Sequence, residues 1–557
     1  MVQRMSGATF LARVLHGYGV GHVFFVEAIL RKALLEMESL GIRRILTHGE
    51  KAAAYMADGY ARMRRGPGVC MAQSVGAANL AAGLQEPFLG GSPVIALTGC
   101  QQPTARYRNA YQEILHGPLY APVTKFHGAV ETLEQWPFLL SQAFREATSG
   151  APGPVHLDLS GHTGQVIEGA EADLEVLVEP AFRQLPAHRP APEEGVLREA
   201  ARLLGQARRP VIVAGGGVSA SGAGAEVVAL AERLSIPVAT SLNGKETLLE
   251  RHPLNLGVVG RYSRWCANRV VSEADLVLFI GSSTGDLVTH GWTVPSPAIA
   301  VIQIDIDPSE LGRSYPGAVA IQGDARLAVR GLLGVVAPSE ATRPWAEHAR
   351  QVVQRWREEV EPLRGSDQVP IRPERLCKEV TECLPPDGVL VADTGFAAIW
   401  TGTMVHLTHP NQRYLRCAGS LGWALPASLG VKCAARERPV LCFTGDGGFW
   451  YHLAELETAC RCGIRTVTVV NNNYALGQCV GSIRRLYAGH PGNPDDLCKF
   501  SRASLAAIAQ EMGCLGIRVE APGEIGPALR RALAADRPAL VEVITDLDCP
   551  APDPWSP

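Results

Sequence analysis

Apolar and polar positions along the chain follow two periods, one typical of strands and one typical of helices. Short apolar runs predict strands, and apolar residues spaced three or four apart predict helices. In the N-terminal part we expect strands at 23–26, 44–47, 68–73 and 93–98 and helices at 8–16 and 30–39. A further helix starts at Glu50 and carries an apolar stripe of Ala53, Met56, Ala57 and Tyr60. Strands that alternate with helices predict a doubly wound α/β domain.

The same alternation returns twice after proline-rich or charged breaks. Residues 168–194 contain Pro180, Pro186, Pro190 and Pro192 and predict a linker. Strands are expected at 210–214, 236–241, 275–281 and 300–305, and a second linker with a charged helix at 345–359 follows. The last part has strands at 389–392 and 539–544 and an irregular tail at 549–557. The fold class is therefore α/β, with three doubly wound parallel-sheet domains at 1–165, 195–337 and 374–557.

One strand–helix–strand unit in the last domain carries polar residues at both strand ends. An apolar run at 440–443 stops at Gly445-Asp446-Gly447, a segment with helical spacing covers 449–462, and the run 466–470 ends in three asparagines. Parallel strands bring Asp446 and Asn473 to one sheet edge, where such sheets bind ligands. A carboxylate and an amide oxygen suit Mg²⁺ held against a phosphate. The turn alone, without the asparagines, favours an ordinary Gly-Asp-Gly loop.

Composition excludes several classes of protein. The net charge of −3 over 557 residues leaves no basic footprint, so we expect no nucleic-acid partner. The 14 cysteines are scattered and too few for a disulfide scaffold, which favours a reduced, cytoplasmic protein. The N-terminus has no apolar signal core, and no apolar run is long enough to span a membrane. We therefore expect a cytoplasmic protein with no membrane contact.

The unit at 445–473 resembles the diphosphate-binding motif of thiamine diphosphate (ThDP) enzymes. The segment at 50–62 resembles the part of those enzymes that carries the catalytic glutamate. Further similarity lies at 110–113, 121–125, 153–158 and 419–426, and the closest branch is acetolactate synthase-like. The resemblance covers nearly the whole chain in the family's order: pyrimidine-binding, central Rossmann-like and diphosphate-binding domains. It implies a ThDP-dependent lyase or transferase.

The resemblance implies a site residue by residue. The Mg²⁺ ligands would be the side chains of Asp446 and Asn473 and the backbone oxygen of Ala475. The cofactor-binding set would comprise Gly445, Asp446, Gly447, Gly448, Leu421, Asn473, Ala475 and Gly477. The catalytic set would comprise Glu50, Gln112 and Glu27. Leu421 would be the apolar wedge that bends the cofactor into a V, although by its residue type it equally fits a core leucine.

Glu50 has the most specific implied role. Its carboxylate would hydrogen-bond the pyrimidine ring and favour the tautomer that takes the thiazolium proton. In isolation, a glutamate that starts a helix is often only a partner of the helix dipole. Gln112, beside Tyr111, would reach the substrate or cofactor side of the pocket. Two motifs in the family's order, about 400 residues apart, favour the catalytic interpretation of Glu50.

The implied reaction is ThDP- and Mg²⁺-dependent decarboxylation of a 2-oxo acid such as pyruvate, with transfer of the acyl carbanion equivalent to an acceptor carbonyl. The alternatives are a decarboxylase or carbon–carbon lyase that releases a free aldehyde, and a non-catalytic cofactor-binding subunit. The family builds its catalytic pocket between two chains, so the partners implied are a small 2-oxo acid and a second copy, in a homodimer or homotetramer.

Departures from the branch lie on the substrate side. Gln478 and Ser482 stand where acetolactate synthases usually have methionine and tryptophan, and Glu27 replaces a Pro-Gly loop. Glu27 would face the reacting atoms as a proton donor or acceptor, or be a solvated loop carboxylate. The central unit lacks the arginine of flavin-binding members near 281–286, which makes FAD doubtful. Its glycines at 215–217 lack the full dinucleotide fingerprint and favour a structural turn.

Overall fold

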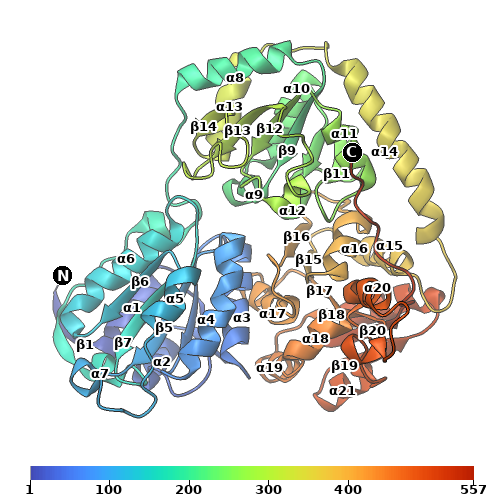
Figure 1. The fold of residues 1–557 in the computed structure, drawn as a ribbon. Coiled ribbons are helices and arrows are strands. Elements are labelled where there is room, and N and C mark those ends of the chain that lie inside the picture. Colours follow the sequence, from blue (N-terminus) through green and yellow to red (C-terminus); the bar gives the residue numbers. More distant parts are fainter. Residues whose placement is uncertain (1) are drawn as a thin grey trace.

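The computed structural model describes residues 2–557, and this range contains three six-stranded parallel sheets with helices on both faces (Figure 1). The predicted α/β class with three doubly wound sheets is confirmed. In Figure 1 the three units form a triangle, with the N-terminal unit in blue, the central unit in green and the C-terminal unit in orange to red. Because ligands bind such sheets at the carboxyl ends of their strands, those three edges are where sites are expected.

The N-terminal sheet has the strand order β3-β2-β4-β5-β7-β6. Its strands are β2 (His22–Phe25), β3 (Arg43–Leu46), β4 (Gly68–Ala72), β5 (Val94–Cys100), β6 (Phe126–Val130) and β7 (Val155–Ser160). Its helices are α1 (Gly7–Gly17), α2 (Arg31–Ser39), α3 (Glu50–Arg64), α4 (Gly76–Gly90), α5 (Gly117–Tyr120), α6 (Trp136–Thr148) and α7 (Gln165–Gly169). The strands expected from the apolar runs lie within two residues of those observed.

The central sheet has the order β11-β10-β9-β12-β13-β14. Its strands are β9 (Pro210–Ala214), β10 (Val238–Thr240), β11 (Asn255–Val258), β12 (Leu276–Ile280), β13 (Ala300–Asp305) and β14 (Val319–Gln322). Its helices are α8 (Glu194–Gln206), α9 (Gly216–Ser221), α10 (Gly224–Leu234), α11 (Trp265–Ser272), α12 (Asp286–Thr289) and α13 (Ala325–Val335). The long helix α14 (Arg343–Arg364) then descends to the C-terminal unit (Figure 1).

The C-terminal sheet has the order β16-β15-β17-β18-β20-β19. Its strands are β15 (Val389–Ala392), β16 (Arg413–Arg416), β17 (Val440–Gly445), β18 (Val467–Asn472), β19 (Leu515–Val519) and β20 (Ala539–Ile544). Its helices are α15 (Pro373–Cys383), α16 (Phe396–Met404), α17 (Ala424–Ala434), α18 (Asp446–His452), α19 (Glu455–Cys462), α20 (Gly477–Leu486), α21 (Leu505–Glu511) and α22 (Ile525–Leu533). The irregular tail lies against the central unit, where the Trp555 carbonyl accepts a hydrogen bond from Asn268.

Two segments differ from the sequence prediction. The single helix expected over 449–462 is two helices, α18 and α19, because the backbone tightens between them into bonds from Leu456 N to Leu453 O and from Glu457 N to Ala454 O. The segment expected to be a linker contains β8 (Glu171–Leu174), which pairs antiparallel with β1 (Gln3–Ser6). This pairing joins chain segments about 165 residues apart, so local composition does not reveal it.

The Glu50 helix is held between two neighbours. α3 packs on α4 in its own unit and along α17 of the C-terminal unit, and residues 52–61 are all buried. Gly59 makes the approach to α17 possible, because a Cβ there would collide with the Ala427 backbone. In residues 2–557 we find no helix with both the length and the apolar character needed to cross a membrane.

Candidate active site

Asp446 lies where β17 ends and α18 begins, at the carboxyl edge of the C-terminal sheet. Its side chain is buried, and its Oδ2 atom has no hydrogen-bond partner. Burial raises the pKa of this carboxyl to about 7, although the backbone N–H groups of Gly447, Asn473 and Ala475 lower it in part. A buried carboxylate oxygen without a partner is costly unless a cation or donor meets it. The site therefore fits a hard cation such as Mg²⁺.

The asparagine-bearing loop lies beside Asp446, as the sequence predicted. β17 and β18 are adjacent and parallel, with Gly445 opposite Asn471. Asn473 Oδ1 accepts a 3.2 Å hydrogen bond from Ala475 N, and the Ala475 carbonyl accepts a 2.9 Å bond from Gly477 N. The backbone N–H groups of Asn473 and Ala475 also act on the Asp446 carboxyl, so the loop that carries the other two predicted ligands lies beside it.

The glycines around Asp446 have different surroundings. A Cβ at Gly447 would lie 2.5 Å from the Leu476 side chain, and one at Gly448 would lie 2.7 Å from Thr444 Oγ1. A Cβ at Gly445 would meet nothing within 4 Å. Gly447 and Gly448 therefore make room for atoms of the protein itself, and Gly445 is the position that faces open space.

Asp393, at the end of β15, is a buried carboxylate that the sequence prediction missed. It accepts hydrogen bonds from the backbone of Thr394 (2.8 Å) and Gly422 (3.1 Å) and from Thr444 Oγ1 (3.1 Å). Burial raises its pKa to about 6. It ties the turn that contains Leu421, which is half-buried, to the end of β17. The available signal was its position directly after an apolar strand, the same pattern that revealed Asp446.

The turn before Leu421 is also held from the N-terminal unit. The fully buried carboxylate of Glu86, on α4, accepts backbone hydrogen bonds from Ala418, Gly419 and Ser420. Tyr55, on α3, contacts Ser420 through its hydroxyl. The helices beside Glu50 therefore position the loop that carries the predicted wedge.

Glu50 is half-buried at the first position of α3, at the carboxyl edge of the N-terminal sheet. Its Oε2 accepts a 3.2 Å hydrogen bond from Asn79, and its side chain fills the space beside Gly76. Gln112 reaches the same region, since its carbonyl accepts a 2.7 Å hydrogen bond from Ser74 Oγ. The buried Gln112 Oε1 has no partner, which fits a polar ligand at this edge.

Glu27 lies in the loop after β2, at the same sheet edge. Its carboxylate is exposed and forms an ion pair with Arg31, whose Nη2 donates to Oε2 at 2.9 Å. The hydrogen bond from Arg31 lowers the pKa of Glu27. The structure therefore presents Glu27 as an ionised, partnered carboxylate.

In the part of the chain that the structure describes, no hydrogen bond or ion pair joins the two predicted half-sites. Across residues 2–557, Glu50 forms no hydrogen bond or ion pair with the loop around Asp446. The end of β3 instead contacts α19, where His48 N donates to Glu455 Oε1 at 3.0 Å. We call the residues around Glu50 and Gln112 the pyrimidine-type half-site and those around Asp446 the diphosphate-type half-site, after the roles that the sequence predicts.

Comparison with known proteins decides the family. Family models described as the N-terminal TPP binding domain, the central domain and the C-terminal TPP binding domain of thiamine pyrophosphate enzymes match residues 5–118, 197–332 and 393–543. A probable acetolactate synthase large subunit of Methanocaldococcus jannaschii is 34% identical over 97% of this chain and 92% of its own length. The chain belongs to the thiamine diphosphate enzymes, in the acetolactate synthase-like branch.

Two further relatives show the same similarity. The acetolactate synthase isozyme 1 large subunit of Escherichia coli K12 is 32% identical over 85% of this chain and 83% of its own length. The acetolactate synthase large subunit of Corynebacterium glutamicum is 30% identical over 98% of this chain and 88% of its own length. The protein is therefore a ThDP-dependent enzyme of the lyase or transferase class.

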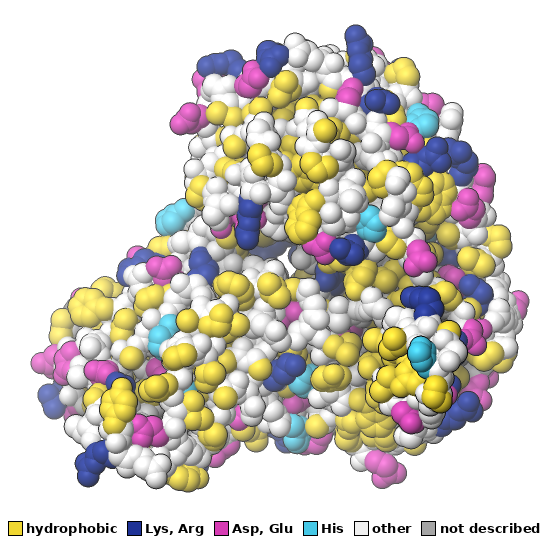
Figure 2. Space-filling view, viewed as in Figure 1, with side chains coloured by type: hydrophobic (Ala, Val, Ile, Leu, Met, Phe, Trp, Pro, Cys, Tyr) yellow, Lys and Arg dark blue, Asp and Glu magenta, His cyan; other side chains and the backbone are white. Residues whose placement is uncertain are grey.

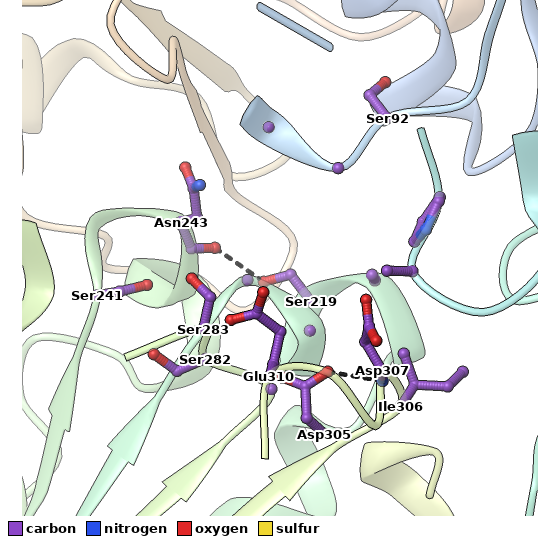
Figure 3. A pocket seen from close by; sticks show the side chains of 18 of the residues that line it. Ser92, Ser219, Ser241, Asn243, Ser282, Ser283, Asp305, Ile306, Asp307 and Glu310 are labelled. Atoms are coloured by element: carbon purple, nitrogen blue, oxygen red, sulfur yellow. Dashed lines mark hydrogen bonds between the residues drawn. The ribbon is translucent and has the colours of Figure 1, made fainter. Parts of the chain in front are cut away.

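This ThDP enzyme also has a large cavity of about 1140 Å³ between its central unit and the other two (Figure 3). Neither Glu50 nor Asp446 lines it. Figure 3 shows Ser219, Asn243, Ser282 and Asp305 around its floor, at the carboxyl edge of the central sheet. Burial raises the pKa of Asp305 to about 6. Figure 2 shows a recess in the molecular surface where the three units meet.

The glycine run at 215–217 forms part of that floor. A Cβ at Gly215 or Gly217 would collide with the Gly281 backbone, so both glycines permit the β9–α9 turn to pack against the end of β12. The run has the structural purpose that the sequence favoured, and Gly216 and Gly217 additionally line the cavity.

Proposed function

We propose that this enzyme uses ThDP and Mg²⁺ to decarboxylate a 2-oxo acid, with pyruvate as the default, and transfers the acyl carbanion equivalent to an acceptor carbonyl. The observation that carries the proposal is the buried, unpartnered Asp446 Oδ2 beside Asn473 and Ala475 in a ThDP-enzyme fold. The names of the relatives, acetolactate synthase large subunits, support a carboligase.

On this proposal the diphosphate-type half-site binds and orients the diphosphate end of the cofactor. The side chains of Asp446 and Asn473 and the carbonyl of Ala475 hold Mg²⁺, and open space at Gly445 admits the diphosphate. Gly447, Gly448 and Gly477 keep the surrounding turns close together, and Leu421 supports the bend of the cofactor. When bound, ThDP supplies a thiazolium ring that accepts the electron pair released as CO₂ leaves.

The residues of the pyrimidine-type half-site control where protons lie during the reaction. Glu50 shares a hydrogen bond with the pyrimidine ring and so favours the proton distribution that activates the cofactor. The buried amide oxygen of Gln112, which has no partner in the protein, accepts a hydrogen bond from the bound ligand. Glu27, ionised beside Arg31, serves as a proton acceptor or an electrostatic partner of the substrate side. The nearby turn at 74–76 sets the distance between these groups.

Because no hydrogen bond joins the two half-sites within one chain, and because the family resemblance implies a pocket between two chains, we propose that the active site forms between two copies, in a homodimer or homotetramer. Coexpression of chains carrying Glu50→Gln with chains carrying Asp446→Ala tests this arrangement. Each single variant should be inactive, and mixed dimers should regain activity at the one site built from two intact halves. Mixed dimers without activity would argue against a shared site.

The central experiment is incubation with ThDP, Mg²⁺ and a panel of 2-oxo acids, followed by measurement of CO₂ and of products by mass spectrometry. A coupled hydroxyketone supports the carboligase, whereas free aldehyde supports the alternative of a decarboxylase or carbon–carbon lyase. No product with any 2-oxo acid, despite ThDP binding, would favour a non-catalytic cofactor-binding subunit. The presence of Glu50 together with Asp446 and Asn473 opposes that last alternative.

A polar residue on the substrate side, Gln478, is the reason for retaining the lyase alternative. Gln478 is exposed at the start of α20, and its amide donates a 3.2 Å hydrogen bond to Tyr262 of the central unit. A polar residue here changes the lining that the acetolactate synthase branch offers to its acceptor. FAD remains doubtful, and the central cavity is a candidate nucleotide or acyl-CoA site. Absorbance and mass spectrometry of the purified protein would reveal a retained flavin or ADP.

A further inference from the structure

A buried carboxylate and imidazole lie directly behind the pyrimidine-type half-site. Asp158 lies within β7, and His116 precedes α5. His116 Nδ1 lies 2.9 and 3.0 Å from the two Asp158 carboxylate oxygens, and its Nε2 lies 2.9 Å from the carbonyl oxygen of Ser74. The side chain of His116 has no exposed surface. The imidazole thus bridges a carboxylate and the backbone of the turn that contacts Gln112.

The hydrogen-bond pattern assigns the protons of this bridge. A carbonyl oxygen and a carboxylate both accept, so both ring nitrogens of His116 donate and the ring is an imidazolium. Burial by itself would raise the pKa of Asp158, but the hydrogen bonds from His116 and Thr98 and the charge of His116 lower it below its ordinary value. The pair is therefore a buried ion pair.

A second imidazole completes the environment of Asp158. Thr98 Oγ1 donates to Asp158 at 2.6 Å, so it accepts from His156 Nε2, also at 2.6 Å. His156 Nδ1 then accepts from His127 Nδ1 at 2.8 Å. Burial keeps the pKa of His156 well below its ordinary value, so this ring is neutral. The ring of Tyr120 stacks on His156.

These residue types would suit a metal ion, since ligand atoms of His116, His156 and Asp158 all lie within 4.8 Å of one another. Their hydrogen bonds argue against that use. Both nitrogens of His116 carry protons, and both nitrogens of His156 are engaged by Thr98 and His127. No imidazole lone pair is left for a cation, so the cluster is a satisfied network.

The contacts of this hydrogen-bond network indicate its structural role. The turn at Ser74 leads into α4, and Gly76 at the start of that helix lies against the Glu50 carboxylate. Tyr120 donates a 2.8 Å hydrogen bond to the Ala77 carbonyl, so α5 holds the first turn of α4 as well. Ser74 N donates to His162 O and Ser74 Oγ to Gln112 O. The turn therefore connects the network to both Glu50 and Gln112.

We propose that the His116–Asp158 ion pair is a positioning element that anchors the Ser74–Gly76 turn and so sets the pyrimidine end of the cofactor pocket. The inference rests on the proposed function for its consequence in catalysis, but its structural part stands independently of the reaction. His116 acts through Ser74 and contacts neither Glu50 nor Gln112 side chains in the hydrogen bonds described. It is a positioning residue and not a catalytic residue.

Two isosteric variants separate the anchoring from the charge. In His116→Gln the amide nitrogen can take the place of Nε2 and keep the bond to Ser74 O, whereas in His116→Asn it takes the place of Nδ1 and keeps only the bond to Asp158. Both variants lose the same positive charge. Backbone hydrogen–deuterium exchange of residues 75–80 is measured in the protein without cofactor, and ThDP affinity is then measured by tryptophan fluorescence with Mg²⁺ present.

We expect His116→Asn to speed exchange at 75–80 about tenfold or more and to weaken ThDP binding by a similar factor, and His116→Gln to stay within about threefold of the unmodified chain. Equal behaviour of the two variants, or unchanged exchange in His116→Asn, would overturn the proposal. If either variant fails to fold, Asp158→Ala in its place removes the carboxylate that holds His116 Nδ1 and must produce the same loss. Should the expected exchange pattern appear in a chain that turns over no 2-oxo acid, the proposed function fails while the positioning role stands.

Discussion

Gly430 on α17 lies directly against the carbonyl of Met56 on α3, at a distance that leaves no room for a side chain. A Cβ at Gly430 would fall well inside the 3.0 Å below which real Cβ contacts essentially do not occur, and the obstructing atoms belong to backbone. The contact couples the helix that begins at Glu50 to the unit that contains Asp446. One missing methyl group thus sets how closely the two units approach.

Gly430→Ala is therefore expected to destabilise the protein by about 1–3 kcal/mol, because neither backbone can move aside without disturbing its own helix. The midpoint of thermal or denaturant unfolding measures the loss. Gly205→Ala, at an exposed position of α8 where a Cβ meets nothing within 4 Å, is the matched control. It should be neutral or stabilising by about 0.5–1 kcal/mol. Equal effects from the two substitutions would show that the α3–α17 contact is not tight.

Glu50→Gln should lower turnover by about 10²–10⁴-fold, since the amide cannot carry the charge that favours cofactor activation. ThDP should still bind, because the diphosphate half-site is untouched. Steady-state kinetics together with ThDP titration separates the two effects. Glu134→Gln, an exposed carboxylate of the same unit, should leave both unchanged. Undiminished turnover in Glu50→Gln would refute the role assigned to Glu50.

Asp446→Ala should weaken Mg²⁺-dependent ThDP binding by more than about 100-fold, the upper range for groups that only support a metal ligand. Thermal unfolding with and without ThDP plus Mg²⁺ measures this effect. The exposed Asp387→Ala serves as control. Retained stabilisation by ThDP and Mg²⁺ in Asp446→Ala would exclude it as a ligand.

Glu27→Gln should lower turnover by about tenfold or more if the carboxylate accepts a proton or orients substrate. The unfolding temperature should hardly change, since an exposed ion pair contributes at most about 1 kcal/mol. Arg31→Gln is the matched variant, because it removes the partner of Glu27 and keeps the carboxylate. Equal activity of Glu27→Gln and the unmodified chain would leave Glu27 as a surface carboxylate of the loop.

His22 gives the protein a defined acid sensitivity. Its ring is buried, both nitrogens lack partners, and burial together with Arg43, Arg436 and Arg64 lowers its pKa to about 4. The unfolded chain binds a proton below about pH 6.5 and the folded chain does not, so the stabilising contribution is complete above pH 6.5 and is lost as the pH falls toward 4. At pH 5 the loss amounts to about 2 kcal/mol.

The variant His22→Phe should therefore lose less stability than the unmodified chain between pH 7.5 and pH 5. Comparing the two chains at both pH values cancels the other titrating groups, which are common to both. Denaturant unfolding at the two pH values provides the measurement. Parallel losses in the two chains would mean that His22 titrates normally in the folded state.

Much of the fold was accessible from the sequence because its signals are local. The strands 389–392, 300–305 and 539–544 are apolar runs bounded by turn residues, and they fold where the pattern predicts. Asp446 and Asn473 were paired correctly because parallel strands must end at the same sheet edge. The break between α18 and α19 was missed, since apolar spacing continues through it and only backbone hydrogen bonds reveal it.

By itself, then, the order of residues determined the three sheets, the family and the polar groups at the strand ends, because periodicity and motif spacing are properties of neighbouring positions. Only the tertiary structure decided which side chains and backbone groups form hydrogen bonds near those strand ends. Asp393 reaches Gly422, Glu86 reaches Ser420, and His116 meets Asp158 across 29 to 334 positions of chain. Such contacts depend on how helices and sheets pack, and a buried polar group finds its partner only when that packing is complete.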